Sequence, residues 1–204
     1  MVDKYYINDV YNSNIVINKS KFISYAHKVE TIDEVNDLLK KYKKQYYDST
    51  HVCYAYVLDI GKEKAYDDGE PSKTAGAPIL EVIKKKNMSN IIIFVIRYFG
   101  GILLGAGGLV RAYTESAVKA LDNATLYKKN KALAFDLVLN YKEFDTLKKI
   151  NNIQIINVIY DLDVKIKCIT NISSKEEIEK ILLSNNIISS ISNIEKTYIY
   201  EKIN

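Results

Sequence analysis

The fold is decided by the stretch Arg97-Tyr-Phe-Gly-Gly-Ile-Leu-Leu-Gly-Ala-Gly-Gly-Leu-Val-Arg111, which joins an apolar run to a helical pattern. All 8 glycines and both prolines of the chain lie between Gly61 and Gly108, and its two arginines are Arg97 and Arg111. Glycine is needed where φ is positive or where another group must approach the backbone closely. Arginine is needed where a planar fork must grip an anion or a carboxylate. We therefore expect the functional site in this part of the chain.

Composition indicates a globular protein that can bury a substantial core. The chain has 204 residues, of which 48% are hydrophobic and 26% charged, enough for one large or two small domains. Its longest apolar runs are about six residues, far below the roughly 20 of a membrane helix, so no membrane span is expected. The start of the sequence has no apolar leader, and the distant Cys53 and Cys168 suggest no disulfide framework, which favours a cytoplasmic location. A net charge of +4 is a mild preference for anionic partners.

The polar stretch Tyr127-Lys-Lys-Asn-Lys131 predicts a boundary between one domain of residues 1–128 and another of residues 129–204. Hydrophobic periodicity in the second segment predicts the order strand, helix, strand, strand, helix, strand. This is the order of a ferredoxin-like βαββαβ domain. Its second helix is expected to begin at a capping box, Ser173-Ser-Lys-Glu176. The predicted fold class is therefore α+β with two domains.

The first segment predicts a hairpin, then helices and strands in alternation. A capping box, Thr31-Ile-Asp-Glu34, predicts the start of the first helix. The strand over residues 51–60 alternates, so His51 and Cys53 share one side, and residues 90–97 are apolar on both faces, as in a central strand. Further helices are expected to begin at Pro78 and at Leu109.

The glycine-rich loop is a candidate anion site. Free amides and the positive end of the following helix would converge there, and Arg111 would add a charged donor. The candidate residues for binding an anion or nucleic acid are Arg97, Gly100, Gly101, Gly105, Gly107, Gly108 and Arg111. The pattern is neither a dinucleotide fingerprint nor a Walker loop. A tight turn with close helix packing is an equally good interpretation.

The acidic loop Asp67-Asp-Gly-Glu-Pro71 carries three carboxylates, those of Asp67, Asp68 and Glu70. They could pair with the scarce arginines, bind a ligand, or serve metal binding or acid–base catalysis. Structural pairing is favoured, because a buried arginine needs a carboxylate partner. We therefore predict that this loop packs beside the glycine-rich loop, with at least one carboxylate within hydrogen-bonding reach of Arg97 or Arg111.

His51 and Cys53 face the same way, which raises the possibility of a cysteine nucleophile with a histidine base. Adjacent side chains on one face of a strand rarely align for proton transfer, so a buried thiol and a hydrogen-bonded histidine are favoured. The spacing of the two histidines and two cysteines is not that of a zinc site. No metal or cofactor is predicted.

Several motifs in one order resemble the pattern of the IMPACT/YigZ family: His51-Val-Cys-Tyr-Ala55, the acidic loop, Thr74-Ala-Gly76, and the stretch from Arg97 to Tyr113. The resemblance spans nearly the whole chain. It implies an N-terminal α+β domain resembling domain IV of elongation factor G, followed by one resembling its domain V. One departure is Lys73, which stands where the family pattern Ser-Gly-Thr-Ala-Gly has glycine.

The resemblance implies a translation-linked regulatory or binding protein, since eukaryotic members restrain a translation-control kinase by competing for its activator. RNA, the ribosome or a protein partner in translation control are the expected partners. One alternative is an enzyme with its site at the acidic loop facing the glycine-rich loop, and another is a pure protein-interaction module. Because the sequence shows no assembled nucleophile, base and orienting group, binding without catalysis is the favoured interpretation.

Overall fold

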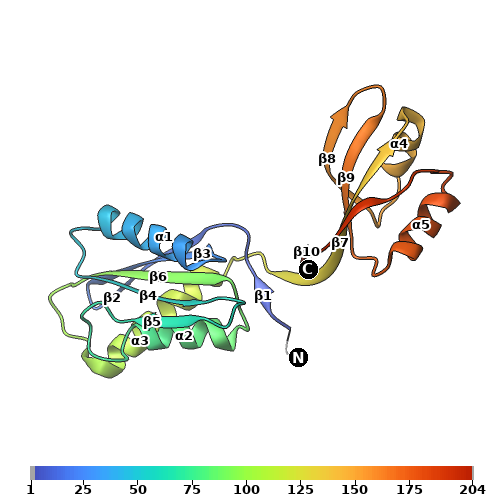
Figure 1. Ribbon diagram of the computed structural model, residues 1–204. Coiled ribbons are helices and arrows are strands. Elements are labelled where there is room, and N and C mark those ends of the chain that lie inside the picture. Colours follow the sequence, from blue (N-terminus) through green and yellow to red (C-terminus); the bar gives the residue numbers. More distant parts are fainter. Residues whose placement is uncertain (1–2, 204) are drawn as a thin grey trace. The chain divides into compact units, whose positions relative to one another are not determined.

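A computed structural model describes residues 3–203. These residues form two compact units (Figure 1). The first unit ends at Lys128 and also includes Lys202 and Ile203, and the second runs from Lys129 to Glu201. The chain therefore passes from one unit to the other twice. The α+β class expected from the sequence is confirmed.

The first unit is a five-stranded antiparallel sheet between two layers of helix (Figure 1). Its elements are β1 (Tyr5–Tyr6), β2 (Tyr11–Ile17), β3 (Ser20–Lys28), α1 (Ile32–Gln45), β4 (His51–Val57), β5 (Glu63–Tyr66), α2 (Gly76–Lys85), β6 (Ile91–Tyr98) and α3 (Gly105–Leu121). The strand order is β2-β3-β6-β4-β5. The apolar strand β6 is thus central, as its sequence predicts, and its first seven residues are buried.

Alternation along β4 divides the hydrophobic core between the two faces of this sheet. Cys53 and Ala55 pack with α2 and α3 on one face. Val52 and Tyr54 pack with α1 on the other, where a group of tyrosines fills the space between helix and sheet. Two-sided burial of the sheet follows from this pattern.

The second unit has the predicted βαββαβ order. Its elements are β7 (Tyr127–Leu139), α4 (Tyr141–Leu147), β8 (Gln154–Tyr160), β9 (Val164–Thr170), α5 (Lys175–Ser184) and β10 (Ser192–Lys202), with strand order β10-β7-β9-β8. Phe144 of α4 and Ile178 of α5 share one core with the inward residues of β7 and β9, so both helices cover the same face. β7 starts before Lys129, and its first two residues pair with β1 of the first unit.

Helix starts show where local sequence signals succeed and where they are displaced. The capping box at Thr31 is present as predicted. The capping box predicted at Ser173 is wrong, because the N-cap of α5 is Ser174, one residue later, whose side chain accepts from the Glu177 amide. A box between Asn140 and Glu143 opens α4, and the sequence analysis did not single it out.

Two helices of the first unit begin earlier than expected. α2 starts at Gly76 and not at Pro78, and α3 starts at Gly105 and not at Leu109. Glycines are poor helix formers, which hid these first turns. Arg111 consequently lies in the second turn of α3 and not in the first. None of the helices among residues 3–203 is long and apolar enough to span a membrane.

Candidate functional site

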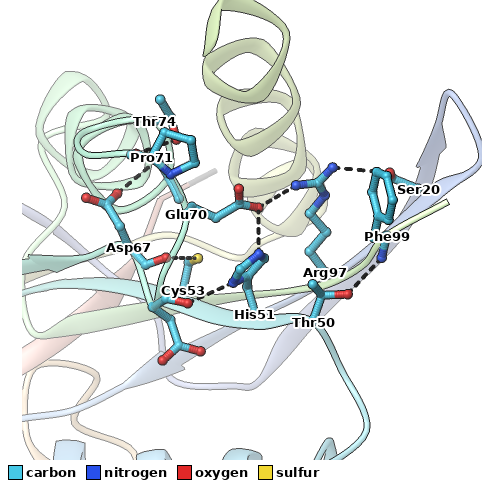
Figure 2. Close-up of polar contacts among 12 residues, drawn as sticks. Ser20, Thr50, His51, Cys53, Asp67, Glu70, Pro71, Thr74, Arg97 and Phe99 are labelled. Carbon is cyan, nitrogen blue, oxygen red and sulfur yellow. Dashed lines mark hydrogen bonds and ion pairs between the residues drawn. The ribbon is translucent and has the colours of Figure 1, made fainter. Parts of the chain in front are cut away.

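Strand register brings the candidate residues together at one end of the first sheet. Arg97 of β6 pairs with Phe22 of β3 on one side and with His51 of β4 on the other. The acidic loop follows β5 and folds back over β4, so that Glu70 meets Arg97 and His51 (Figure 2). The glycine-rich loop leaves the same end of β6 and leads into α3.

The three carboxylates of the acidic loop do not form one cluster, because each has its own set of partners. Asp67 serves α2: Oδ1 accepts hydrogen bonds from the amides of Ala75 and Gly76 at 3.0 and 2.8 Å, and Oδ2 accepts from that of Lys73 at 2.9 Å. This satisfies amides at the helix start that would otherwise lack partners. Asp67 is therefore a helix cap supplied from outside the helix.

Asp68 ties the loop to β4. Its Oδ2 accepts from the Val52 amide at 2.7 Å, and its carbonyl oxygen lies 2.7 Å from His51 Nδ1. Asp68 and Gly69 both have positive φ, at 45° and 85°. The Asp-Gly pair thus makes the sharp turn that the sequence indicates.

Glu70 is the centre of the site. Its Oε1 accepts from Arg97 Nη1 at 2.7 Å and from the Tyr113 hydroxyl at 2.8 Å, and His51 Nε2 lies 3.8 Å away. The side chains of Glu70 and Arg97 are 3% and 6% exposed. Burial raises the pKa of Tyr113, which keeps its hydroxyl a donor. The predicted contact between an acidic-loop carboxylate and an arginine is confirmed.

Arg97 is held from three further directions. Its guanidinium lies 5.6 Å from the ring centre of Phe22 and 5.5 Å from that of Phe99, and Nη2 donates to Ser20 Oγ at 3.4 Å. Such stacking suits the planar arginine side chain. A residue so enclosed is a scaffold element, and a surface phosphate would have to compete with Glu70 for it.

Cys53 is fully buried and adjoins this cluster, since its Sγ lies 3.4 Å from the Tyr113 hydroxyl. Burial raises the pKa of its thiol, and Sγ donates to the Asp67 carbonyl at 3.0 Å (Figure 2). A protonated, enclosed thiol is a poor nucleophile. His51 and Cys53 share one side of β4, but each is bonded to a different backbone carbonyl.

The glycines of the loop meet different requirements. A side chain at Gly100 would lie 2.0 Å from the Lys19 carbonyl carbon, so close backbone packing against the β2–β3 turn requires glycine there. Gly101 and Gly105 have positive φ, 81° and 66°, in open space. Gly107 is exposed and Gly108 half-buried in the first turn of α3.

Arg111 differs from Arg97 in being exposed. Its Nε donates to the Gly107 carbonyl of its own helix at 3.3 Å, and no carboxylate of residues 3–203 pairs with it. The first turn of α3 has no acidic residue and no side-chain cap. An anion near this turn would therefore meet the amides of an uncapped helix start and a guanidinium without a carboxylate partner among residues 3–203.

The residues from Asn18 to Leu121, which carry this site, fall inside the match to a known family: residues 18–121 match the Impact N-terminal domain. The chain belongs to the IMPACT family. A protein of Bacillus subtilis (strain 168) described as IMPACT family member YvyE is 45% identical over 126 residues, which are 60% of this chain and 58% of that protein. IMPACT family member YigZ of Escherichia coli (strain K12) is 33% identical over 62% of this chain and 64% of its own length.

The chain thus spans less than two thirds of these IMPACT relatives in the matched regions. A solved structure described as the crystal structure of an hypothetical protein is 26% identical, with a TM-score of 0.63. It covers 96% of this chain and 98% of its own, so the structural likeness extends over both units.

The sequence analysis missed two residues of this IMPACT site, and the first is Tyr113. It is fully buried and shares Glu70 Oε1 with Arg97. Its sequence signal is a tyrosine on the apolar face of α3, which ordinary core packing explains equally well. Ser20 was also missed, although its hydroxyl contacts both Arg97 and the Gly100 amide.

Proposed function

We propose that this protein is a translation-linked binding protein whose first unit contacts RNA or the ribosome through the start of α3 and Arg111. The observation that carries the proposal is that Arg111 has no carboxylate partner among the described residues and lies next to a helix start with neither side-chain cap nor acidic residue. Backbone amides and a guanidinium together suit phosphate oxygens.

Two of the candidate contact residues have structural roles that make them poor phosphate ligands. Arg97 is committed to Glu70, and Gly100 is required by packing. The remaining contacts are the exposed Gly101, the first-turn glycines Gly105, Gly107 and Gly108, and Arg111. The proposal therefore assigns phosphate binding to the helix start and a supporting role to the buried ion pair.

The translation-linked setting rests on membership of the IMPACT family and on the resemblance of the two domains to domains IV and V of elongation factor G. A cytoplasmic location and a domain boundary near residues 128 and 129 belong to the same proposal. The net charge of +4 favours anionic partners only mildly. Weak, salt-sensitive binding is what these features support.

Salt dependence of RNA binding tests the proposal. Each phosphate contact on a single strand adds about −0.7 to the log–log salt slope, so three or four contacts predict a slope of roughly −2 to −3. Filter binding would be measured across roughly 50–300 mM salt, the range in which such contacts are lost. Arg111→Gln should weaken binding whatever the RNA sequence and reduce the slope by about 0.7.

Lys149→Gln is the matched control, because Lys149 is exposed in the second unit. It should leave affinity and slope unchanged. A flat salt response for the unsubstituted protein, together with no sedimentation with ribosomes at low salt, would exclude the nucleic-acid interpretation. A protein partner in translation control would then be the better proposal.

A further inference from the structure

A cleft of about 380 Å³ opens in the first unit between the acidic loop and the glycine-rich loop. Its size lies at the lower end of the range for small-molecule sites. Its polar lining comes from Glu70, Arg97 and His51, and its apolar walls come from Phe99, Leu103 and Leu109. Few polar groups among apolar walls are typical of a site that orients one ligand.

The carboxylate of Glu70 is used unevenly. Oε1 accepts hydrogen bonds from both Arg97 and Tyr113, whereas Oε2 has no hydrogen-bond partner among the described residues. Among the described residues, Arg97 Nε is the fully buried side-chain nitrogen or oxygen without a hydrogen-bond partner. Glu70 lines the cleft, and Oε2 keeps its acceptor capacity there, although the side chain as a whole is only 3% exposed.

In its neutral form, His51 adds a second acceptor beside it. A carbonyl oxygen can only accept, so the 2.7 Å contact with the Asp68 carbonyl requires His51 Nδ1 to donate. In the neutral imidazole this leaves the lone pair on Nε2, which lies 3.8 Å from Glu70 Oε1. The floor of the cleft therefore favours a ligand group that donates hydrogen bonds, such as an ammonium group.

The other end of the cleft has the opposite preference. Gly105 and Ala106, the first residues of α3, line it and are exposed. Their amides lie at the positive end of an uncapped helix, which favours a carboxylate or another anion. The wall beside them is apolar and open, with Leu103 86% and Phe99 46% exposed.

The net charge of the cleft indicates what kind of ligand could satisfy both preferences. The buried charges of Glu70 and Arg97 cancel, so a ligand with a large net charge of either sign has no buried counter-charge. A zwitterion offers a donor to one end and an anion to the other while remaining neutral. Its apolar part would cover Phe99 and Leu103.

We propose that this cleft binds a free α-amino acid with an apolar side chain. Its ammonium group contacts Glu70 Oε2, and its carboxylate lies at the first amides of α3. The side chain packs against Phe99 and Leu103. This goes beyond the proposed function and does not depend on it, although an RNA phosphate and the carboxylate would compete for the same amides.

Calorimetry on the full chain, without RNA, tests the ligand class. Leucine is compared with 3-methylbutylamine, which lacks the carboxylate, and with 4-methylpentanoate, which lacks the ammonium group. Each analogue should bind about tenfold or more weakly than leucine, because each loses hydrogen bonds to a charged group. Absence of saturable leucine binding, or equal binding of either analogue, would overturn the proposal.

Two variants locate the site. Leu103→Ser should weaken leucine binding about fivefold, because it removes an apolar wall that is exposed and hence dispensable for folding. Leu162→Ser, at a leucine 93% exposed in the second unit, is the matched control and should change nothing. Unchanged affinity in Leu103→Ser would overturn the placement in this cleft. Glu70→Gln, if circular dichroism shows it folded, should weaken leucine binding but not that of 4-methylpentanoate.

Discussion

Arg97 and Glu70 form a buried ion pair in which Nη1 donates to Oε1 at 2.7 Å, with side chains 6% and 3% exposed. One of the two arginines in the chain is thereby committed to one of the three acidic-loop carboxylates. The pair joins β6 to the loop after β5. Tyr113 of α3 donates a hydrogen bond to the same Glu70 oxygen, so α3 is linked to them as well. Because the pair links three elements, it is a determinant of the shape of the cleft.

Arg97→Ala should lower the free energy of unfolding by about 3–5 kcal/mol, because it leaves Glu70 buried without its charged partner. Urea unfolding measures this. Lys148→Ala is the control, since Lys148 pairs with Asp145 on the surface, where the side chains are 50% and 68% exposed. That change should cost less than about 1 kcal/mol. A similar small loss for both variants would contradict the scaffold role.

Gly100→Ala and Gly101→Ala should differ sharply although they are neighbours. At Gly100 a methyl group would lie 2.0 Å from the Lys19 backbone, so the β2–β3 turn must move and the protein should be severely destabilised. At Gly101 a methyl group meets open space, and the cost is about 1–2 kcal/mol for positive φ. Equal urea midpoints for the two would contradict the close approach.

Lys73→Gly should stabilise the protein. Lys73 has a φ of 63°, in the left-handed region that favours glycine. Relief of about 1–2 kcal/mol of left-handed strain outweighs the roughly 0.5–1 kcal/mol of extra chain entropy that glycine brings. Thermal unfolding should show a raised midpoint. Lys62→Gly, at an exposed residue without positive φ, should lower it slightly.

Stability should fall as the pH drops from about 6.5 towards 4. Burial, followed by the nearby charge of Lys41, lowers the pKa of His27 from 6.5 to about 4. Below pH 6.5 the unfolded chain therefore binds this proton before the folded one does, and up to about 3 kcal/mol is lost through this window. His27→Gln should reduce the pH slope in urea unfolding.

Tyr42→Phe discriminates the cause of that shift. His27 Nε2 lies 2.6 Å from the Tyr42 hydroxyl, but burial is the main reason that the pKa of His27 is lowered. The phenylalanine keeps the site dry, so the pH slope should persist. Loss of the slope in this variant would assign the shift to the hydrogen bond and not to burial.

The second unit, expressed as residues 129–201, should fold alone. Phe135, Phe144 and Ile178 belong to a core made within this unit, and both helices cover one face of its sheet. Far-UV circular dichroism should show mixed α/β content and cooperative melting. A random-coil spectrum would count against a domain boundary near residue 128.

The sequence predicted those features that depend on a local pattern or on a residue type that is rare in the chain. Alternation in β4 predicted both faces of the first sheet, and the scarcity of arginine predicted its contact with an acidic-loop carboxylate. β5 was missed because its four residues are all exposed and have no apolar face. Asp67 could not be recognised as a cap, since the amides that donate hydrogen bonds to it lie six to nine residues further along the chain.

The double passage of the chain between its units has a consequence for cleavage. β7 leaves the first unit after Lys128, and the chain returns at Lys202, where the Ile203 amide donates to the Leu126 carbonyl at 2.9 Å. If a protease cuts one loop of the second unit, the N-terminal fragment keeps the first unit and β7, and the C-terminal fragment stays attached to it because β10 pairs with β7 and Ile203 bonds to Leu126. In denaturing gel electrophoresis such a nicked protein would separate into two bands, whereas in native gel filtration it would still elute as one species.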